Sequence, residues 1–403
     1  MKILMSCRQH PYHLCGGLAI ASWNTARAAA DAGHDVTYIT GKHPTKEWSE
    51  ENGIKVHWLK DMSPEADGYP FLYNYLRNEK NKLREQFDVF HSQSSALTPL
   101  LDNGIPVIFQ DHGTQLAAMQ DDFNQNSFGQ KHTPFYNAKI PYYQMYHEFN
   151  KFIEGREIEY LRRFNAVLAT SKISMLDLCT RYYLTNCHLF YHCIYDLPEP
   201  SIRDSNKQPI IGVFAYGLDS PQKSVTYGLK QLLPLKDEII IKVVGKGTQV
   251  ADFASKNFKN VIVKGYLPEN EAIKELQEID VLFECSCHHR GTNLTAITAL
   301  GLGIPVLSYP TGGHMDLIGE DALNKTFGPG GAIVDPLPLW HHPTTKPSDF
   351  NRINPDVCKV LMHLVENRKT FSETALSHFK NRFSPQTCSK SLDFIYKNVI
   401  VRN

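Results

Sequence analysis

The chain has 403 residues, which is enough for two domains of ordinary size. Its 42 basic and 42 acidic residues cancel, so the overall charge does not point to nucleic acid or to a membrane surface. The sequence has no run of about 18 apolar residues, which predicts no transmembrane segment, and its first residues predict a strand and not a signal peptide. Nine cysteines at irregular spacings favour free thiols, so we expect a cytoplasmic protein.

The beginning of the chain predicts a strand, a loop and a helix. Residues 2–7 form an apolar run, a polar loop with His10 and His13 follows, and Gly16 and Gly17 open an alanine-rich helix. The loop lacks the G-x-G-x-x-G pattern, which disfavours a dinucleotide-dependent dehydrogenase. The two glycines either let a substrate approach the backbone or only serve a tight turn.

Apolar runs predict further strands at residues 36–40, 55–59, 89–91, 107–109, 166–170 and 189–194. In an open α/β sheet, ligands bind beyond the carboxyl ends of the strands. His112 stands at such a place, so we expect it to contact a sugar or a phosphate. We expect its neighbour Asp111 to bind an acceptor, together with His10 and His13. A helix predicted at 141–164 has a basic side, which is either a solvated surface or a wall of the acceptor site.

A change in composition divides the chain. Residues 199–208 are rich in proline and charge, which predicts a linker between a first domain at 1–198 and a second at 209–383. The second domain begins a new α/β series, with strands predicted at 210–216, 239–244, 261–263 and 280–283. Two helices are expected at 355–368 and 370–381, and a last one follows Pro385.

The stretch 283–313 predicts a strand, a polar loop, a helix, a short strand and a glycine loop. A loop that passes directly into a helix presents free backbone N–H groups and the positive end of the helix dipole, which together bind anions. We therefore predict a phosphate site at Gly291, Thr292, Asn293 and Leu294, and its most natural ligand is a nucleotide diphosphate. The Cys-x-Cys-His-His run just before this site lacks a standard zinc spacing, so we predict no metal site.

Several local motifs occur in a fixed order along the chain. They are Gly16-Gly17 before the first helix, Phe87-Asp88-Val89-Phe90-His91, Asp111-His112-Gly113, Lys242-Val243-Val244-Gly245-Lys246-Gly247, and Gly303-Ile304-Pro305-Val306 followed by Gly312-Gly313. In this order they resemble the GT-B glycosyltransferases, specifically the large retaining family that uses nucleotide-sugar donors. The resemblance implies an α/β fold of GT-B architecture, with two Rossmann-like domains that face a central cleft. It also implies that the C-terminal helix at 384–403 packs back on the first domain.

The donor motif departs from that of the family. The family usually has two glutamates separated by seven residues, and these positions hold Arg290 and Thr298 here. The family also pairs an arginine with a lysine on the diphosphate, of which only Lys223 remains. The resemblance therefore implies Lys223 on the leaving phosphate, Arg290 as a replacement cation, and Thr298 on the ribose. Glycines at the ends of strands and helices complete the implied donor site, namely Gly16, Gly17, Gly217 and Gly245.

The resemblance implies a glycosyltransferase that moves a sugar from a nucleotide-sugar to a hydroxyl group of a saccharide, a lipid-linked glycan or a small molecule. It assigns catalysis to His112, Lys223 and Arg290, with a retaining outcome and no metal or other cofactor. Two alternatives stay open. One is a phage-type enzyme that glycosylates a hydroxymethylated base in DNA, and the other is a GT-B protein that binds nucleotide-sugars without turnover.

Overall fold

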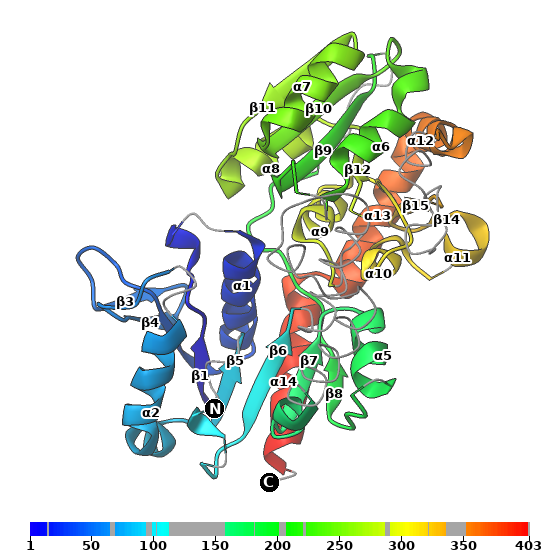
Figure 1. Ribbon diagram of the computed structural model, residues 1–403. Coiled ribbons are helices and arrows are strands. Elements are labelled where there is room, and N and C mark those ends of the chain that lie inside the picture. The colour runs from blue at the N-terminus through cyan, green and yellow to red at the C-terminus, as the bar shows by residue number, and fades with distance from the viewer. Residues whose placement is uncertain are drawn as a thin grey trace, which may run out of the picture. The chain divides into compact units, whose positions relative to one another are not determined.

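The computed structural model describes residues 1–13, 16–64, 69–93, 99–101, 103–112, 158–180, 182–200, 207–220, 223–286, 291–320, 322–335 and 352–401. These residues divide into two compact units, which Figure 1 shows as ribbons. Unit 1 contains the described residues through His112, then Ile158–Tyr195, and finally the chain from Phe383 onward. Unit 2 contains the described residues of Asp196–Arg382. The chain therefore returns to unit 1 for its last helix.

Unit 1 is built on an eight-stranded sheet in the order β3-β4-β2-β1-β5-β6-β7-β8. The strands are β1 (Lys2–Ser6), β2 (Asp35–Thr40), β3 (Trp48–Glu51), β4 (Ile54–Trp58), β5 (Val89–Ser92), β6 (Val107–Asp111), β7 (Ala166–Ala169) and β8 (Cys187–Leu189). All neighbouring strands are parallel except β3 and β4, which form a hairpin at one edge. The central strands are buried on both faces, which is why they appear in the sequence as continuous apolar runs.

The described helices of unit 1 are α1 (Gly17–Asp31), α2 (Tyr69–Gln86), α5 (Lys172–Thr180) and α14 (Pro385–Val401), with a short 3-10 helix η1 (Pro11–His13). Alanines on α1 let α14 pack closely against it (Figure 1). The helix α1 ends in a Schellman motif, in which the N–H of His34 donates to Ala29 O and that of Gly33 donates to Ala30 O. Gly33 has a φ of +84°, a conformation that favours glycine at this position.

The strand predicted at 189–194 is wrong in its position. The observed strand β8 ends at Leu189, and it pairs only with β7. Phe190 and Cys193 are buried, but they pack against the last helix and join no strand. The apolar pattern indicated burial correctly, and burial against a helix leaves the same pattern as burial in a sheet. The helix predicted at 141–164 lies mostly outside the described residues.

Unit 2 is built on a seven-stranded sheet in the order β11-β10-β9-β12-β13-β15-β14. The strands are β9 (Ile210–Gly217), β10 (Ile240–Lys246), β11 (Asn260–Lys264), β12 (Val281–Glu284), β13 (Val306–Ser308), β14 (Phe327–Gly328) and β15 (Gly331–Ile333). The helical segments are α6 (Val225–Gln231), η6 (Leu233–Leu235), α7 (Thr248–Asn257), α8 (Glu269–Gln277), α9 (Leu294–Gly301), α10 (His314–Ile318), α11 (Ala322–Lys325), α12 (Pro355–Glu366) and α13 (Arg368–Arg382). Only the short pair β14 and β15 is antiparallel.

Both sheets have the strand order of a doubly wound fold. In unit 1 the order reverses between β1 and β5, and in unit 2 it reverses between β9 and β12. Ligands of such sheets bind outside the carboxyl ends of the strands at this reversal. The predicted α/β class with two Rossmann-like parts is therefore confirmed. In the described part of the chain, no helix has both the length and the apolar composition that crossing a membrane requires.

Candidate functional site

The loop after β12 leads directly into α9, as the sequence predicts for a phosphate site. Asn293 is the N-cap of this helix, and its Oδ1 accepts a hydrogen bond of 2.9 Å from the N–H of Thr295. Gly291 and Thr292 are buried just before it. A capped helix start at the carboxyl edge of a parallel sheet, next to the reversal of strand order, is a suitable place for an anionic ligand.

A buried carboxylate holds this loop, and the sequence analysis missed it. Glu284 is the last residue of β12 and only 4% exposed. Its Oε1 accepts a hydrogen bond of 3.1 Å from the N–H of Ser286, and its Oε2 accepts one from the side-chain amide of Asn293. The carboxylate therefore ties the beginning of the loop to its end. The signal in the sequence was a glutamate at the last position of an otherwise apolar strand.

The glycine loop after β13 lies against the phosphate loop. A Cβ atom on Gly313 would stand 2.3 Å from the carbonyl oxygen of Gly291, so only glycine fits there. The next residue, His314, is fully buried, and burial lowers its pKa. The charge of Glu284 raises this pKa and the charge of Lys223 lowers it. Lys223, the predicted phosphate-binding lysine, stands two residues before α6, and its charge acts on the same ring as that of Glu284.

The other predicted donor residues lie at several places in unit 2. Thr298 is buried in α9, where its hydroxyl donates a hydrogen bond of 2.9 Å to Leu294 O and keeps only its lone pairs for a ribose. Gly217 is the last residue of β9. Gly245 has a φ of +142°, and a Cβ there would stand 1.7 Å from a carbonyl oxygen of β9, so packing of the sheet requires this glycine. Arg290 lies outside the described residues.

A cation rests on two tyrosine rings at the same edge of the sheet, and this cluster was also missed. The ammonium group of Lys246 donates a hydrogen bond of 3.0 Å to the Tyr216 hydroxyl, which raises the lysine pKa. It lies 4.6 Å from the ring centroid of Tyr216 and 5.0 Å from that of Tyr266. Tyr216 is 51% exposed. An accessible aromatic surface with a fixed cation suits a flat ligand with carbonyl oxygens.

In unit 1, His112 follows directly after β6, at the carboxyl edge where it was predicted. Its Nε2 lies 2.6 Å from Oε1 of Gln93, which follows β5. Its ring stacks on that of His192, with 5.1 Å between centroids and an interplanar angle of 9°. Burial lowers the pKa of His112 well below the usual value and that of His192 to about 4. The sequence analysis missed both Gln93 and His192, because they meet His112 only in the folded sheet.

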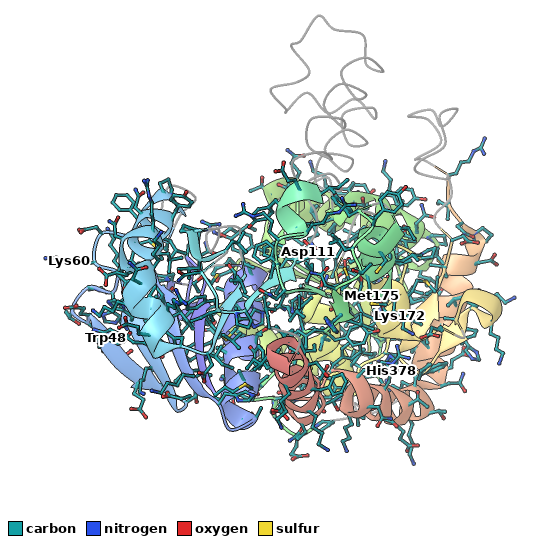
Figure 2. All side chains as sticks on the ribbon, turned by 90° about the horizontal axis from the view of Figure 1, so that it is seen from below. Trp48, Lys60, Asp111, Lys172, Met175 and His378 are labelled. Atoms are coloured by element: carbon teal, nitrogen blue, oxygen red, sulfur yellow. The ribbon has the colours of Figure 1, made fainter. Side chains whose placement is uncertain are left out.

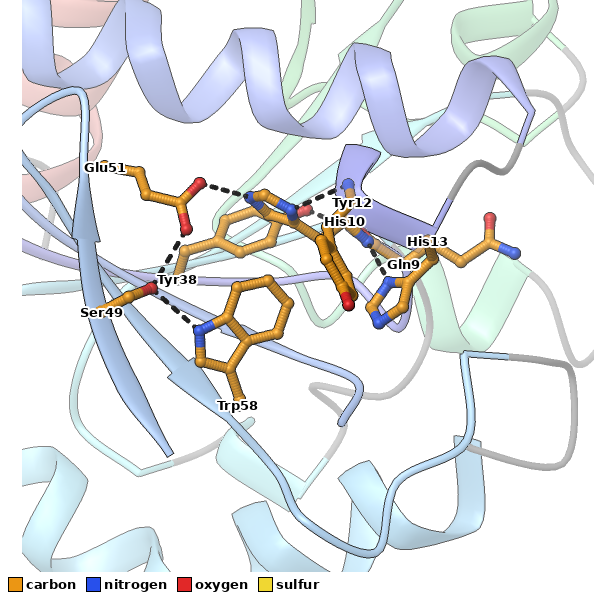
Figure 3. Close-up of polar contacts among 8 residues, drawn as sticks. All are labelled: Gln9, His10, Tyr12, His13, Tyr38, Ser49, Glu51 and Trp58. Atoms are coloured by element: carbon orange, nitrogen blue, oxygen red, sulfur yellow. Dashed lines mark hydrogen bonds and ion pairs between the residues drawn. The ribbon is translucent and has the colours of Figure 1, made fainter. Parts of the chain in front are cut away.

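The predicted acceptor residues divide into buried and accessible ones. His10 is 3% exposed and lies between Trp23 and Trp58, with ring centroids 4.4 Å and 4.9 Å away. Figure 3 shows its hydrogen bonds. The ring Nδ1 of His10 accepts from the backbone N–H of Tyr12 at 3.1 Å, and the backbone N–H of His10 donates to Nδ1 of His13 at 3.0 Å. Burial lowers the pKa of His10 to about 3. His10 is therefore a neutral core residue that shapes its loop.

His13, Asp111 and the glycines occupy the same edge of unit 1. His13 is half-buried, and since its Nδ1 is an acceptor, its Nε2 donates to Lys42 O at 3.0 Å. Asp111 is buried at the end of β6 in the middle of the sheet (Figure 2). Trp48, also labelled in Figure 2, marks the outer strand β3 at the edge of the same sheet. Gly16 is the N-cap of α1 and Gly17 its first residue. A Cβ on Gly16 would meet nothing within 4 Å, so packing does not require this glycine.

Comparisons with known proteins agree with this architecture. The family model Glycosyltransferase Family 4 matches residues 15–194, and the model Glycosyl transferases group 1 matches residues 209–333. A sequence comparison with curated proteins gave no match. No group of three or more His, Cys, Asp or Glu side chains that could hold a metal ion occurs among the described residues.

Solved glycosyltransferases share the fold over nearly the whole chain. Sucrose-phosphate synthase from Thermosynechococcus elongatus has a TM-score of 0.73 at 13% identity, with 100% of both chains covered. The catalytic domain of starch synthase IV from Arabidopsis thaliana, bound to ADP and acarbose, has a TM-score of 0.66 at 12% identity, covering 100% of this chain and 99% of that one. HepE of Anabaena, in complex with UDP and glucose, has a TM-score of 0.62 at 14% identity, covering 97% and 98%. Since the two family models together match more than half of its 403 residues, the chain belongs to the group 1 and family 4 glycosyltransferases of GT-B fold.

Proposed function

We propose that this glycosyltransferase transfers a sugar from a nucleotide-sugar to a hydroxyl group of a saccharide, with retention of configuration and without a divalent metal. The observation that carries the proposal is the phosphate loop of unit 2. Glu284 ties its two ends together, Asn293 caps the helix behind it, and Gly313 lies against it. These bonds fix the two described ends of the loop to each other without a ligand, which lowers the ordering cost of binding a diphosphate there.

Protein groups can supply the positive charge that a metal would otherwise bring. The N-terminal end of α9 carries the positive end of the helix dipole, and Lys223 adds a full positive charge whose field reaches His314. As the glycosidic bond breaks, negative charge grows on the leaving diphosphate, and these groups stabilise it. Arg290 is the second cation in this proposal, and we assign the contact with the sugar to His112.

The cluster of Tyr216, Lys246 and Tyr266 supports a nucleotide as the carrier of the phosphates. It lies at the ends of β9 and β10 and just after β11, one to three strands from β12, and neighbouring strands are about 4.8 Å apart. The separation between this cluster and the end of β12 therefore matches the distance between the base and the phosphates of a nucleotide. Two proteins of this fold were solved with nucleoside diphosphates and saccharides, namely HepE with UDP and glucose and starch synthase IV with ADP and acarbose.

One observation favours a second candidate, a protein that binds nucleotide-sugars without turnover. The hydroxyl of Thr298 is bonded inside α9, so it replaces the family glutamate only weakly as a ribose ligand. Binding and turnover are therefore measured separately. A hydroxymethylated DNA base is the alternative acceptor, and a duplex that carries such bases belongs in the acceptor panel next to oligosaccharides.

The test is calorimetric titration with nucleoside diphosphates and nucleotide-sugars in the presence of EDTA, followed by transfer assays with the donor that binds. We expect one nucleotide to bind without metal, Lys223→Ala to weaken it at least tenfold, and the product to keep the anomeric configuration of the donor by NMR. A requirement for a divalent metal, or an inverted product, would contradict the proposal. Tight binding with no transfer to any acceptor would support the binding protein instead.

A further inference from the structure

We propose that Gln93 is a positioning residue for His112. It fixes the orientation and the tautomer of the His112 imidazole, so that this ring acts as a neutral hydrogen-bonding group and not as a general acid or base. The inference rests on the proposed contact of His112 with the sugar. Its structural part, the state of the His112 ring, can be measured without any substrate.

Three side chains from different elements form a chain of hydrogen bonds that ends at His112. The amide Nε2 of Gln93 donates to Oε1 of Gln110 at 2.7 Å, and the Thr25 hydroxyl on α1 lies 3.2 Å from the same oxygen and 2.9 Å from Ala21 O. With its nitrogen directed at Gln110, Gln93 presents Oε1 to His112 at 2.6 Å. An amide oxygen can only accept, so the His112 Nε2 carries a proton, and in the neutral ring Nδ1 then keeps its lone pair.

Burial makes this arrangement rigid. Gln93 is 3% exposed and Gln110 is fully buried, so neither amide can exchange its partner for bulk water. Turning either amide alone would place two donors or two acceptors face to face, which is unfavourable in a buried site. The orientation of the Gln93 amide is therefore coupled to that of Gln110, and the tautomer of His112 is coupled to both.

The surroundings of His112 also favour the neutral ring. His192 stacks on one face of it, and His91 of β5 is close enough to affect its charge. Both neighbours are themselves buried, which lowers their pKa values to about 4 and about 3. Gln93 adds a dipole but no charge to the surroundings of His112. The acidic residue nearest to His112 in the sequence is Asp111, which directly precedes it. A carboxylate in place of Gln93 would reverse this balance.

The substitution Gln93→Glu tests the idea at nearly constant volume. The new carboxylate still accepts from His112, but its charge favours a second proton on the ring. Its other oxygen would face Oε1 of Gln110, and this conflict is relieved when the Gln110 amide turns and donates its Nε2. That nitrogen has no hydrogen-bond partner among the described residues, so the turn breaks no other side-chain bond of Nε2. We therefore expect this variant to fold.

The readout is the 15N NMR spectrum of the histidine rings, with His112 assigned by the loss of its signals in His112→Gln. We expect a neutral ring with the proton on Nε2 in the unaltered protein at pH 7, and a doubly protonated ring in Gln93→Glu. The kcat of transfer should fall at least tenfold in this variant and rise again on raising the pH, because the carboxylate variant regains a neutral ring. Gln93→Leu should lose kcat without this recovery.

A matched control separates positioning from general damage. Gln231 of unit 2 is as buried as Gln93 and also makes two side-chain hydrogen bonds, to Arg352 O at 2.9 Å and from the N–H of Asn354 at 2.7 Å. Gln231→Leu should leave the His112 signals unchanged. A wild-type proton on Nδ1, or a ring unaffected by Gln93→Glu, would overturn the inference. If the ring responds as expected but kcat does not, the proposed role of His112 in transfer is the part that fails.

Discussion

The junction between Glu284 and Asn293 gives the sharpest test of how the phosphate loop is held. Asn293 makes two bonds at once: its Oδ1 caps α9, and its Nδ2 donates to the buried carboxylate of Glu284. Two substitutions separate these bonds. Asn293→Ala removes both of them, whereas Asn293→Asp keeps the cap and places a second carboxylate beside the first.

The expected magnitudes follow from the two bonds. Loss of an N-cap costs about 1 kcal/mol. An unpaired acceptor in a site as buried as that of Glu284 adds about 1–3 kcal/mol. We therefore expect Asn293→Ala to destabilise unit 2 by about 3 kcal/mol at neutral pH. In Asn293→Asp, two negative charges about 4 Å apart repel each other by up to about 4 kcal/mol at an effective dielectric constant of about 20.

The two variants differ in their dependence on pH. In Asn293→Asp the repulsion raises the folded-state pKa of the introduced carboxyl group above its value in the unfolded chain. The folded state then binds more protons than the unfolded state, so stability rises as the pH falls from about 8 to about 5. A shared proton restores the hydrogen bond between the two side chains. Asn293→Ala introduces no second charge and leaves only the lost hydrogen bond acting on Glu284, so its deficit should recover much less at low pH.

Scanning calorimetry between pH 5 and 8 measures these effects. For a unit of this size, about 3 kcal/mol corresponds to a fall in Tm of roughly 6–12 °C. Titration with the nucleotide that binds should show at least tenfold weaker affinity in both variants at pH 8, and a clearly larger recovery at pH 5 in Asn293→Asp than in Asn293→Ala. A deficit below about 0.5 kcal/mol in Asn293→Ala, or a deficit in Asn293→Asp that is the same at both pH values, would refute this account of the loop.

Three further predictions concern single residues of the two units. Lys242→Met should change the free energy of unfolding by less than about 1 kcal/mol in urea, while Glu275→Met should lower it by about 2 kcal/mol, because the fully buried Lys242 ammonium, 2.8 Å from the Glu275 carboxylate, would keep only the mostly exposed Glu278 carboxylate as its partner. Burial lowers the pKa of His91 to about 3, so unfolding at a pH below about 6.5 takes up a proton at this ring. The unaltered protein therefore loses stability between pH 7 and pH 5, and calorimetry should find this loss about 2 kcal/mol smaller in His91→Phe. Gly313→Ala should weaken nucleotide binding at least tenfold in titration, since its Cβ would stand 2.3 Å from the backbone of the phosphate loop, whereas Gly265→Ala, whose Cβ meets nothing within 4 Å, should bind normally.

The fold was predictable because its signals are local. Each buried parallel strand is a short apolar run, and each run is separated from the next by a helix or a polar loop. The error at 189–194 shows the limit of this reasoning. An apolar run records that a segment is buried, and it does not record whether the covering element is a strand or, as for Cys193, the distant helix α14.

The candidate site also has features that the local sequence indicates and contacts that only the folded chain creates. The helix start at the candidate phosphate loop was predictable because its signal is local: Asn293 caps the helix that begins one residue later. Glu284 was missed although it stands only nine residues before Asn293, because a glutamate at a strand end is usually solvated and no pattern indicates its burial. Gln93 and His192 are 19 and 80 residues away from His112, and only the order of the strands brings the three together.

The two units hold their functional side chains by different physical means, and this difference should be visible in the effect of variants. In unit 2, the buried Glu284 carboxylate ties the two ends of the proposed phosphate loop together, and the Lys223 ammonium is the cation proposed for the phosphates. In unit 1, neutral amides and buried imidazoles surround His112. A charged anchor organises binding of an ion, so unit 2 variants should change the nucleotide Kd and its dependence on salt. A neutral chain sets the direction of one ring, so Gln93 variants should change kcat and leave the nucleotide Kd unaltered. If Gln93→Leu and Lys223→Ala shifted the same constant, this division of roles between the units would be wrong.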